Sequence, residues 1–285
     1  MTSEQKVAPI TRTTAEQKTM AWTFRNLCLA RDLVLPNAWD AASAVCIARA
    51  GAPAVATASA GIAWAAGAPD GGGLSADDAI SALTKIVQAT NLPVTADIEN
   101  GYSHDGPGLI RFIHQVLNLG VVGINVEDSH DAQLMEATAQ AERVAIIRQT
   151  ADSYGVSLFI NARVDTAFFG SPDQAERDAD SIRRSARYID AGADRIFIPG
   201  VTDLPTVSHL AKSVSVPLNI MAGPGSPAAH ELLEAGAGRV TTGMSGALAA
   251  YEAIEASARE LIEEGTYIRL SPALDFSSFN SSMER

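Results

Sequence analysis

The stretch Thr95–Tyr102 reads T-A-D-I-E-N-G-Y and decides both the fold and the site. It follows Leu-Pro-Val, an apolar run typical of the start of a buried β-strand. Side chains alternate between the two faces of a strand, so the carboxylates of Asp97 and Glu99 point to the same face. A D-x-E pair at a strand end can also simply cap the next helix. The residues at the ends of the neighbouring strands therefore distinguish a functional carboxylate pair from a helix cap.

Two later strand-like runs also end in charged residues. Residues 123–128 read G-I-N-V-E-D, which includes Glu127, and residues 159–165 read F-I-N-A-R-V-D, which includes Arg163. Carboxylates gathered at the ends of neighbouring strands can hold a hard divalent cation that prefers oxygen ligands. We therefore predict that Asp97, Glu99 and Glu127 bind Mg²⁺, or Mn²⁺ in its place.

The composition limits the class of protein. The chain has 285 residues, of which 47% are hydrophobic, so it can bury a large core, either as one barrel-sized domain or as two ordinary domains. Its formal net charge of −12 repels nucleic acid and anionic membranes, and neither is an expected partner. Cys28 and Cys46 are the only cysteines, and the polar N-terminus does not resemble a secretory signal. We expect a cytoplasmic protein.

Strand-like and helix-like segments alternate along the whole chain. The predicted strands are 33–36, 54–57, 93–98, 122–127, 157–163, 195–199, 217–221 and 239–242. The predicted helices are 40–50, 76–90, 108–119, 139–154, 172–191, 204–213, 227–235 and 245–264, with an additional N-terminal helix at 14–31. Eight such units predict a (β/α)₈ TIM-type barrel, because a doubly wound sheet usually has fewer strands.

The barrel forms a single predicted domain over residues 1–285, with a flexible segment at 1–13 and an irregular tail at 265–285. Barrel enzymes carry their chemistry at the C-terminal strand ends, where the acidic residues and Arg163 have already been placed. The segment Ala58–Gly61 follows the second strand, and its backbone N–H groups could hold an anionic oxygen. Its glycine could equally serve a tight turn alone.

Five motifs in this order resemble signatures of the isocitrate lyase and phosphoenolpyruvate mutase superfamily. They are P-N-A-W-D-A at 36–41, G-A-P-D at 67–70, T-A-D-I-E-N-G-Y at 95–102, G-I-N-V-E-D at 123–128 and N-A-R-V-D at 161–165. The resemblance spans roughly residues 25 to 265. It implies a Mg²⁺-dependent enzyme that makes or breaks a C–C or P–C bond next to an α-keto acid or its enolate.

The resemblance also implies roles for the charged residues. Asp97 matches a carboxylate that coordinates the metal directly, while Glu99 and Glu127 match groups that hold it through water. Arg163 matches the arginine that binds the substrate carboxylate. Such a metal would stabilise the enolate that forms when a bond beside a ketone breaks.

Further positions match the substrate side of the superfamily site. Ala58, Ser59 and Ala60 fall on the segment that receives the oxygens of the keto acid. Asp70 matches an aspartate in the loop after the second strand and is, with Arg163, a candidate catalytic residue. Asn219 is a weaker match to a polar substrate contact. The resemblance therefore implies a small carboxylate as the substrate.

The chain departs from the resemblance after the fourth strand. Isocitrate and methylisocitrate lyases carry a K-[KR]-C-G-H type loop there, whereas residues 128–140 read D-S-H-D-A-Q-L-M-E-A-T-A-Q. The Lys and Asn of the mutase and hydrolase loops are also absent. His130 is the one obvious proton carrier in this segment, although an exposed histidine is usually idle.

Three hypotheses remain open from the sequence. The first is a Mg²⁺-dependent lyase that cleaves a C–C bond of a small α-keto or 2-hydroxy carboxylate by retro-aldol cleavage or decarboxylation. The second is a P–C bond enzyme of the phosphonopyruvate hydrolase or phosphoenolpyruvate mutase type. The third is a non-catalytic protein that binds keto acids. Superfamily members exchange their last helix between subunits, so the resemblance implies a homodimer or homotetramer.

Overall fold

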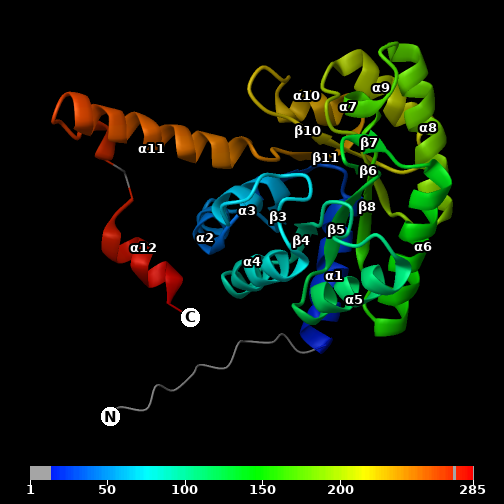
Figure 1. Cartoon of the computed structure of the whole chain (residues 1–285), viewed down its shortest axis with the longest axis horizontal. Helices are drawn as coiled ribbons and strands as arrows, with labels where there is room; N and C mark the ends of the chain where they lie inside the picture. The colour runs from blue at the N-terminus through cyan, green and yellow to red at the C-terminus, as the bar shows by residue number, and fades with distance from the viewer. Residues whose placement is uncertain (1–13, 272–273, 285) are drawn as a thin grey trace.

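Parallel strands alternate with helices and close into a barrel (Figure 1). The computed structural model describes residues 14–271 and 274–284, so the segment 1–13 that we expected to be flexible lies outside the described residues. The barrel strands are β1 (Leu33–Leu35), β2 (Asn37–Ala38), β3 (Val55–Thr57), β4 (Val94–Asp97), β5 (Gly123–Glu127), β8 (Phe159–Arg163), β9 (Arg195–Phe197), β10 (Leu218–Met221) and β11 (Ala237–Thr241).

The order of the strands in the sheet is β1-β11-β10-β9-β8-β5-β4-β3-β2. The two outermost strands of this order, β1 and β2, are consecutive in the chain and are separated by Pro36 alone. Proline has no backbone N–H, so it interrupts the hydrogen-bond ladder of what is otherwise one strand. The sheet therefore closes on itself, and the predicted (β/α)₈ barrel is confirmed.

The main helices follow the predicted pattern. They are α1 (Thr14–Leu29), α2 (Ala41–Arg49), α4 (Ala76–Gln88), α5 (Gly106–Asn118), α6 (Ala137–Tyr154), α8 (Gln174–Asp190), α9 (Leu204–Ser213), α10 (Ala229–Glu234) and α11 (Ser245–Glu263). An aspartate side chain accepts a backbone hydrogen bond at the start of α2, α5, α8 and α9. These N-caps fix where each helix begins after its strand.

Several short elements were not predicted. The Ala-rich run after β3 forms α3 (Ser59–Ala65) instead of a loop, and α7 (Thr166–Phe169) precedes α8. A two-stranded hairpin, β6 (Ser129–His130) and β7 (Gln133–Leu134), follows β5. The tail that we expected to be irregular contains a 3₁₀ turn at Ile268–Leu270 and the helix α12 (Phe276–Met283).

The interior of the barrel is polar, because alternate strand residues face inward. The Arg239 side chain on β11 donates to Asn125 Oδ1 on β5 at 2.9 Å, and these two strands are not neighbours in the sheet. Asn161 on β8 donates to the same oxygen at 2.7 Å. The intervening residues, such as Ile124 and Ile160, are fully buried in the apolar core. Along these strands, residues that point into the barrel thus alternate with apolar residues that pack against the surrounding helices.

Helix α1 closes the N-terminal end of the barrel. Its Phe24 packs edge-on against Phe159 at the start of β8, with ring centroids 5.6 Å apart. Gly123 leaves room for this ring, since a Cβ atom there would lie 2.8 Å from Phe24 Cε1. The opposite, C-terminal end of the barrel therefore remains as the place for a site.

Helix α11 extends away from the barrel, and α12 turns back toward α2 (Figure 1). The Arg49 guanidinium on α2 lies over the Phe279 ring of α12 at 5.8 Å and donates to Ser282 Oγ at 3.0 Å. Among the described helices, none combines the length and the apolar character needed to cross a membrane.

Candidate active site

The C-terminal ends of β4, β5 and β8 bring the predicted charged side chains together. Glu127 lies in register with Arg163, and Asp97 on the adjoining strand lies in register with Asn125. Parallel strands end at the same edge of a sheet, so residues far apart in the sequence become neighbours there. The charged residues that we predicted at these three strand ends thus lie at one edge of the barrel.

Arg163 is held between two carboxylates. Its Nη1 forms an ion pair with Glu127 Oε2 at 2.8 Å, and its Nε donates a hydrogen bond to Asp165 Oδ1 at 2.7 Å. Burial alone would lower the pKa of Arg163, but the carboxylates of Glu127, Asp165 and Asp97 raise it above its ordinary value. The guanidinium therefore stays charged, and its orientation is fixed on two sides.

Glu99 has both carboxylate oxygens occupied. Tyr102 donates its hydroxyl to Glu99 Oε1 at 2.8 Å, and the backbone N–H of Gly72 donates to Oε2 at 2.8 Å. Burial raises the pKa of Glu99, while the bond from Tyr102 lowers it. The Glu99 backbone has a φ of 47°, in the left-handed region that a non-glycine residue rarely adopts. Strain of this kind tends to accumulate at functional sites.

Two further carboxylates of the cluster, besides Glu99, have raised pKa values. Burial raises the pKa of Asp97 to about 6, although Arg163 lowers it. Burial likewise raises the pKa of Glu127 to about 8, against the opposing effect of Arg163. Both carboxylates thus sit where negative charge is costly, and a bound cation would relieve that cost.

The donor set fits a hydrated Mg²⁺ ion. Among residues 14–271 and 274–284, no three His, Cys, Asp or Glu side chains converge closely enough to enclose a metal directly. Mg²⁺ does not require this, because it keeps several waters and takes one or two protein carboxylates. Both oxygens of Glu99 accept hydrogen bonds and Glu127 pairs with Arg163, which suits contact with the metal through water. Asp97 accepts the Glu99 N–H at one oxygen, Oδ1, at 3.2 Å, which leaves its other oxygen for a direct bond to a cation.

A pocket of about 270 Å³ opens beside this cluster. Its lining includes Asp70, Asn100, Glu127, His130, Arg163 and Phe169. Asp70 and His130, which we predicted to take part in the reaction, thus share one pocket with Glu127 and Arg163. The lining of the pocket thus includes a guanidinium, carboxylates, an imidazole and an aromatic ring.

His130 lies on the β6–β7 hairpin, and its side chain is 36% exposed. The Asn100 amide lies 2.9 Å from its Nδ1, and the His104 ring packs against it with centroids 4.8 Å apart. The hairpin turn consists of Asp131 and Ala132, both at positive φ. The chain thus passes the pocket in a two-residue turn.

Two sets of predicted substrate contacts lie elsewhere. Ala58 is the N-cap of α3, and Ser59 and Ala60 form its first turn, where backbone N–H groups lack helical acceptors. They do not line the 270 Å³ pocket. Asn219 is fully buried inside the barrel, where its Oδ1 accepts from Arg239 Nε at 2.7 Å. A substrate role for either set stays a prediction.

Sequence reasoning assigned no role to several residues of the site. Tyr102 and Asn100 lie in the T-A-D-I-E-N-G-Y stretch, and Asp165 lies in N-A-R-V-D. The sequence does not indicate their hydrogen-bond partners. Ser129 donates to Asp165 Oδ2 at 2.5 Å, a contact between residues on two different strand ends. Strand order alone would have suggested that these two residues are close.

A (β/α)₈ barrel with acidic side chains at the C-terminal ends of its strands is typical of barrel enzymes. The model of the phosphoenolpyruvate phosphomutase family matches residues 24–262, and the chain belongs to this family, within the isocitrate lyase and phosphoenolpyruvate mutase superfamily.

Curated relatives include both uncharacterized and characterized proteins. An uncharacterized protein of Mycobacterium tuberculosis is 35% identical over 74% of this chain and 77% of its own. The 2-methylisocitrate lyase of Bacillus subtilis is 28% identical over 72% of this chain and 67% of its own. Oxaloacetate decarboxylase 2 of Pseudomonas putida is 28% identical over 70% and 65%. The two named enzymes are carbon–carbon lyases, and this chain is an enzyme of that type.

A solved structure from Burkholderia cenocepacia J2315, provisionally described as a lyase/mutase, matches with a TM-score of 0.86 and 31% identity. The match covers 93% of this chain and 96% of that one.

Proposed function

We propose that the protein is a Mg²⁺-dependent lyase that cleaves a C–C bond of a small α-keto or 2-hydroxy carboxylate, by retro-aldol cleavage or decarboxylation through an enolate. The observation that carries the proposal is the position of Arg163, fixed by Glu127 and Asp165 at the edge of the 270 Å³ pocket. A fixed guanidinium with free N–H groups orients a carboxylate through paired hydrogen bonds.

The proposed function assigns metal binding to the carboxylates and substrate binding to Arg163. Asp97 would hold Mg²⁺ directly, and Glu99 and Glu127 would hold its waters. The bound metal would supply positive charge where the enolate oxygen develops its negative charge. Arg163 binds and orients the substrate carboxylate, which aligns the bond to be broken.

Asp70 and His130 are the proton-transfer candidates, since both line the pocket with Arg163. The imidazole of His130 has one ring nitrogen that can accept a proton and one that can donate it. The first N–H groups of α3, at Ser59 and Ala60, are proposed to face a substrate oxygen once the ligand is bound.

The test is pyruvate release with Mg²⁺ and with chelator from oxaloacetate, 2-methylisocitrate, isocitrate, dimethylmalate and phosphonopyruvate, with glyoxylate and phosphate measured in parallel. Asp97→Ala and Arg163→Ala are run beside the wild type, with His209→Gln on exposed helix α9 as a matched control. Metal-dependent turnover that both site variants lose supports the proposal. Binding of a keto acid without turnover of any substrate contradicts it and favours a binding protein.

The family match to phosphoenolpyruvate phosphomutase favours a second candidate, a P–C bond enzyme. Phosphonopyruvate distinguishes the two within the same assay. Phosphate release from this substrate, or its isomerisation to phosphoenolpyruvate, without pyruvate release from the C–C substrates, would replace the first candidate by the second.

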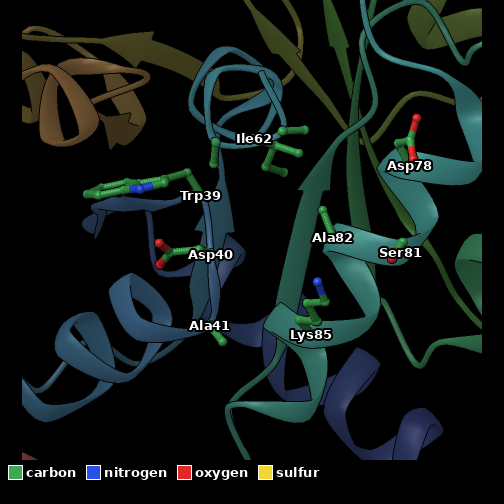
Figure 2. A pocket seen from close by; sticks show the side chains of 10 residues that line it. Trp39, Asp40, Ala41, Ile62, Asp78, Ser81, Ala82 and Lys85 are labelled. Atoms are coloured by element: carbon green, nitrogen blue, oxygen red, sulfur yellow. The ribbon is translucent and has the colours of Figure 1, made fainter. Parts of the chain in front are cut away.

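We also propose that the chain forms a homodimer or homotetramer through α11. This helix carries the exposed side chains Leu248, Ile254, Leu261 and Ile262 along its length. Near its first turns, a second cavity of about 370 Å³ lies between α2, α3 and α4, and Trp39, Ile62 and Lys85 line it (Figure 2). Exposed apolar helix faces and an adjoining cavity are typical of subunit interfaces.

Light scattering coupled to gel filtration tests this assembly. Ile254→Asp together with Leu261→Asp should shift the protein toward the monomer. Glu255→Lys on the same helix, in an exposed ion pair with Arg259, is the control and should leave the mass unchanged. A wild-type monomer at micromolar concentration would contradict the proposal.

A further inference from the structure

A chain of hydrogen bonds leads away from Arg163 to Ser129. The Arg163 Nε donates to Asp165 Oδ1 at 2.7 Å, and the other oxygen of the same carboxylate accepts from Ser129 Oγ at 2.5 Å. Asp165 is fully buried and Ser129 is 4% exposed, so water does not compete for these bonds. The orientation of the Asp165 carboxylate therefore depends on the Ser129 hydroxyl.

The backbone of Asp165 is fixed separately. Its N–H donates to Asp128 Oδ1 at 2.8 Å, and Asp128 Oδ2 accepts from the Tyr188 hydroxyl at 2.7 Å and from Arg184 Nη1 at 3.1 Å. These bonds place the Cα of Asp165 but leave the rotation of its carboxylate free. Ser129 is the one described residue, besides Arg163, that donates to that carboxylate.

The rotation of the Asp165 carboxylate determines how the Arg163 guanidinium is oriented at the pocket. Arg163 uses Nε for Asp165 and Nη1 for Glu127, and its Nη2 donates to none of the described residues. The guanidinium is planar, so fixing Nε and Nη1 also fixes the direction of the Nη2 edge. That edge belongs to a residue that lines the 270 Å³ pocket.

We infer that Ser129 is a positioning residue for substrate binding: through Asp165 it sets the angle at which the free edge of Arg163 meets a ligand carboxylate. The inference rests on the proposed function, in which Arg163 binds that carboxylate. The inference goes beyond the proposed function because it assigns a role to Ser129, the first residue of the β6–β7 hairpin. The same hairpin carries His130, so Ser129 also ties the proton-transfer candidate to the carboxylate binder.

The test compares Ser129→Ala, Ser129→Thr and the control Ser185→Ala. Ser185 is an equally buried serine on α8, and its hydroxyl donates to the Ser181 carbonyl. With Mg²⁺ present, Ser129→Ala should raise KM, and the Kd for oxalate measured by calorimetry, roughly tenfold, with kcat within about twofold of wild type. Ser129→Thr should restore both constants, and Ser185→Ala should leave both unchanged.

A second variant traces the path of the effect. If Ser129 acts through Asp165, then Ser129→Ala should add little to the loss already caused by Asp165→Asn, so the two effects are not additive. Fully additive losses would overturn the inference. So would wild-type KM and Kd in Ser129→Ala, or an equal loss in Ser185→Ala.

A third readout needs neither metal nor turnover. The Nε–H proton of Arg163, identified by its loss in Arg163→Lys, should exchange slowly with solvent in NMR spectra of the wild type and at least tenfold faster in Ser129→Ala. Slow exchange that is unaffected by the substitution overturns the inference. If the wild type turns over none of the substrates but this exchange changes as expected, the proposed function fails and the positioning role stands.

Discussion

Tyr102 and Glu99 are three residues apart, and the tyrosine hydroxyl donates to the carboxylate at 2.8 Å across a tight turn in which both have positive φ. This bond stabilises the ionised form of a buried carboxylate. It therefore connects the E-N-G-Y segment of the sequence to the proposed metal site.

Replacing Tyr102 by Phe should weaken Mg²⁺ binding. The loss of one hydrogen bond to a buried carboxylate costs about 1 to 2 kcal/mol, so the Mg²⁺ concentration for half-maximal activity should rise about five- to thirtyfold. Saturating Mg²⁺ should restore most of kcat. A Mg²⁺ titration identical to that of the wild type would contradict the role of this bond.

The raised pKa values predict how pH acts on the metal-free protein. Burial raises the pKa of Glu127 to about 8, above its unfolded value, so the folded state binds the proton more tightly than the unfolded state. Stability should therefore fall as pH rises from about 5 to 8 in chelator. Thermal melts of wild type and Glu127→Gln check this, since the variant should have the flatter dependence on pH.

Metal binding should show the complementary effect. A cation needs Asp97 ionised, and burial raises the pKa of this carboxylate to about 6. Mg²⁺ affinity should therefore increase between pH 5 and pH 7, with proton release on binding. Calorimetry in buffers of different ionisation enthalpy measures the released protons. Equal heats in all buffers at pH 6 would be the contrary result.

Gly61 and Gly246 make a matched pair around Trp39. A Cβ at Gly61 would lie 2.6 Å from Trp39 Cβ, whereas one at Gly246 would lie 3.4 Å from Trp39 Cζ3. Gly61→Ala should lower the free energy of unfolding by about 1 to 3 kcal/mol despite the better helix propensity of alanine. Gly246→Ala should be neutral or stabilising. Urea melts compare the two, and equal midpoints would show that α3 can move away.

Ala132 occupies the second turn position of the β6–β7 hairpin at a φ of 56°. Glycine adopts this conformation without steric cost, so Ala132→Gly should raise the free energy of unfolding by about 0.5 to 1 kcal/mol. Ala48→Gly within helix α2 is the control and should lower it by a similar amount. A destabilised Ala132→Gly variant would argue against the turn as described.

The repeated alternation of strands and helices was sufficient to predict the barrel. The Gly residues that end helices, such as Gly51 and Gly120, mark the units because left-handed positions favour glycine. The strand-end positions of Asp97, Glu127 and Arg163 followed from the same counting. Each strand–helix unit can be recognised from a short segment of sequence, and eight such units are enough to close the sheet into a barrel.

The remaining features depend on contacts between distant segments. The predicted strand order makes β5 and β8 neighbours, but the hairpin at Ser129 and its bond to Asp165 also depend on how the side chains rotate, which no local pattern indicates. Helix α3 was missed because an Ala- and Gly-rich run is equally compatible with a loop, and packing against Trp39 decides between them. The polar barrel interior around Arg239 likewise has no local signature.

The β6–β7 hairpin is anchored at both ends, because the Met135 N–H donates back to the Asp128 carbonyl at 2.8 Å. The ends of the excursion are therefore already held together, and a longer connection would cost little additional closure entropy. Residues added between Asp131 and Ala132 would extend over the mouth of the pocket while the barrel beneath keeps its register. This turn is thus a natural insertion point for engineering a cover, and its length could be varied as an independent parameter of substrate access.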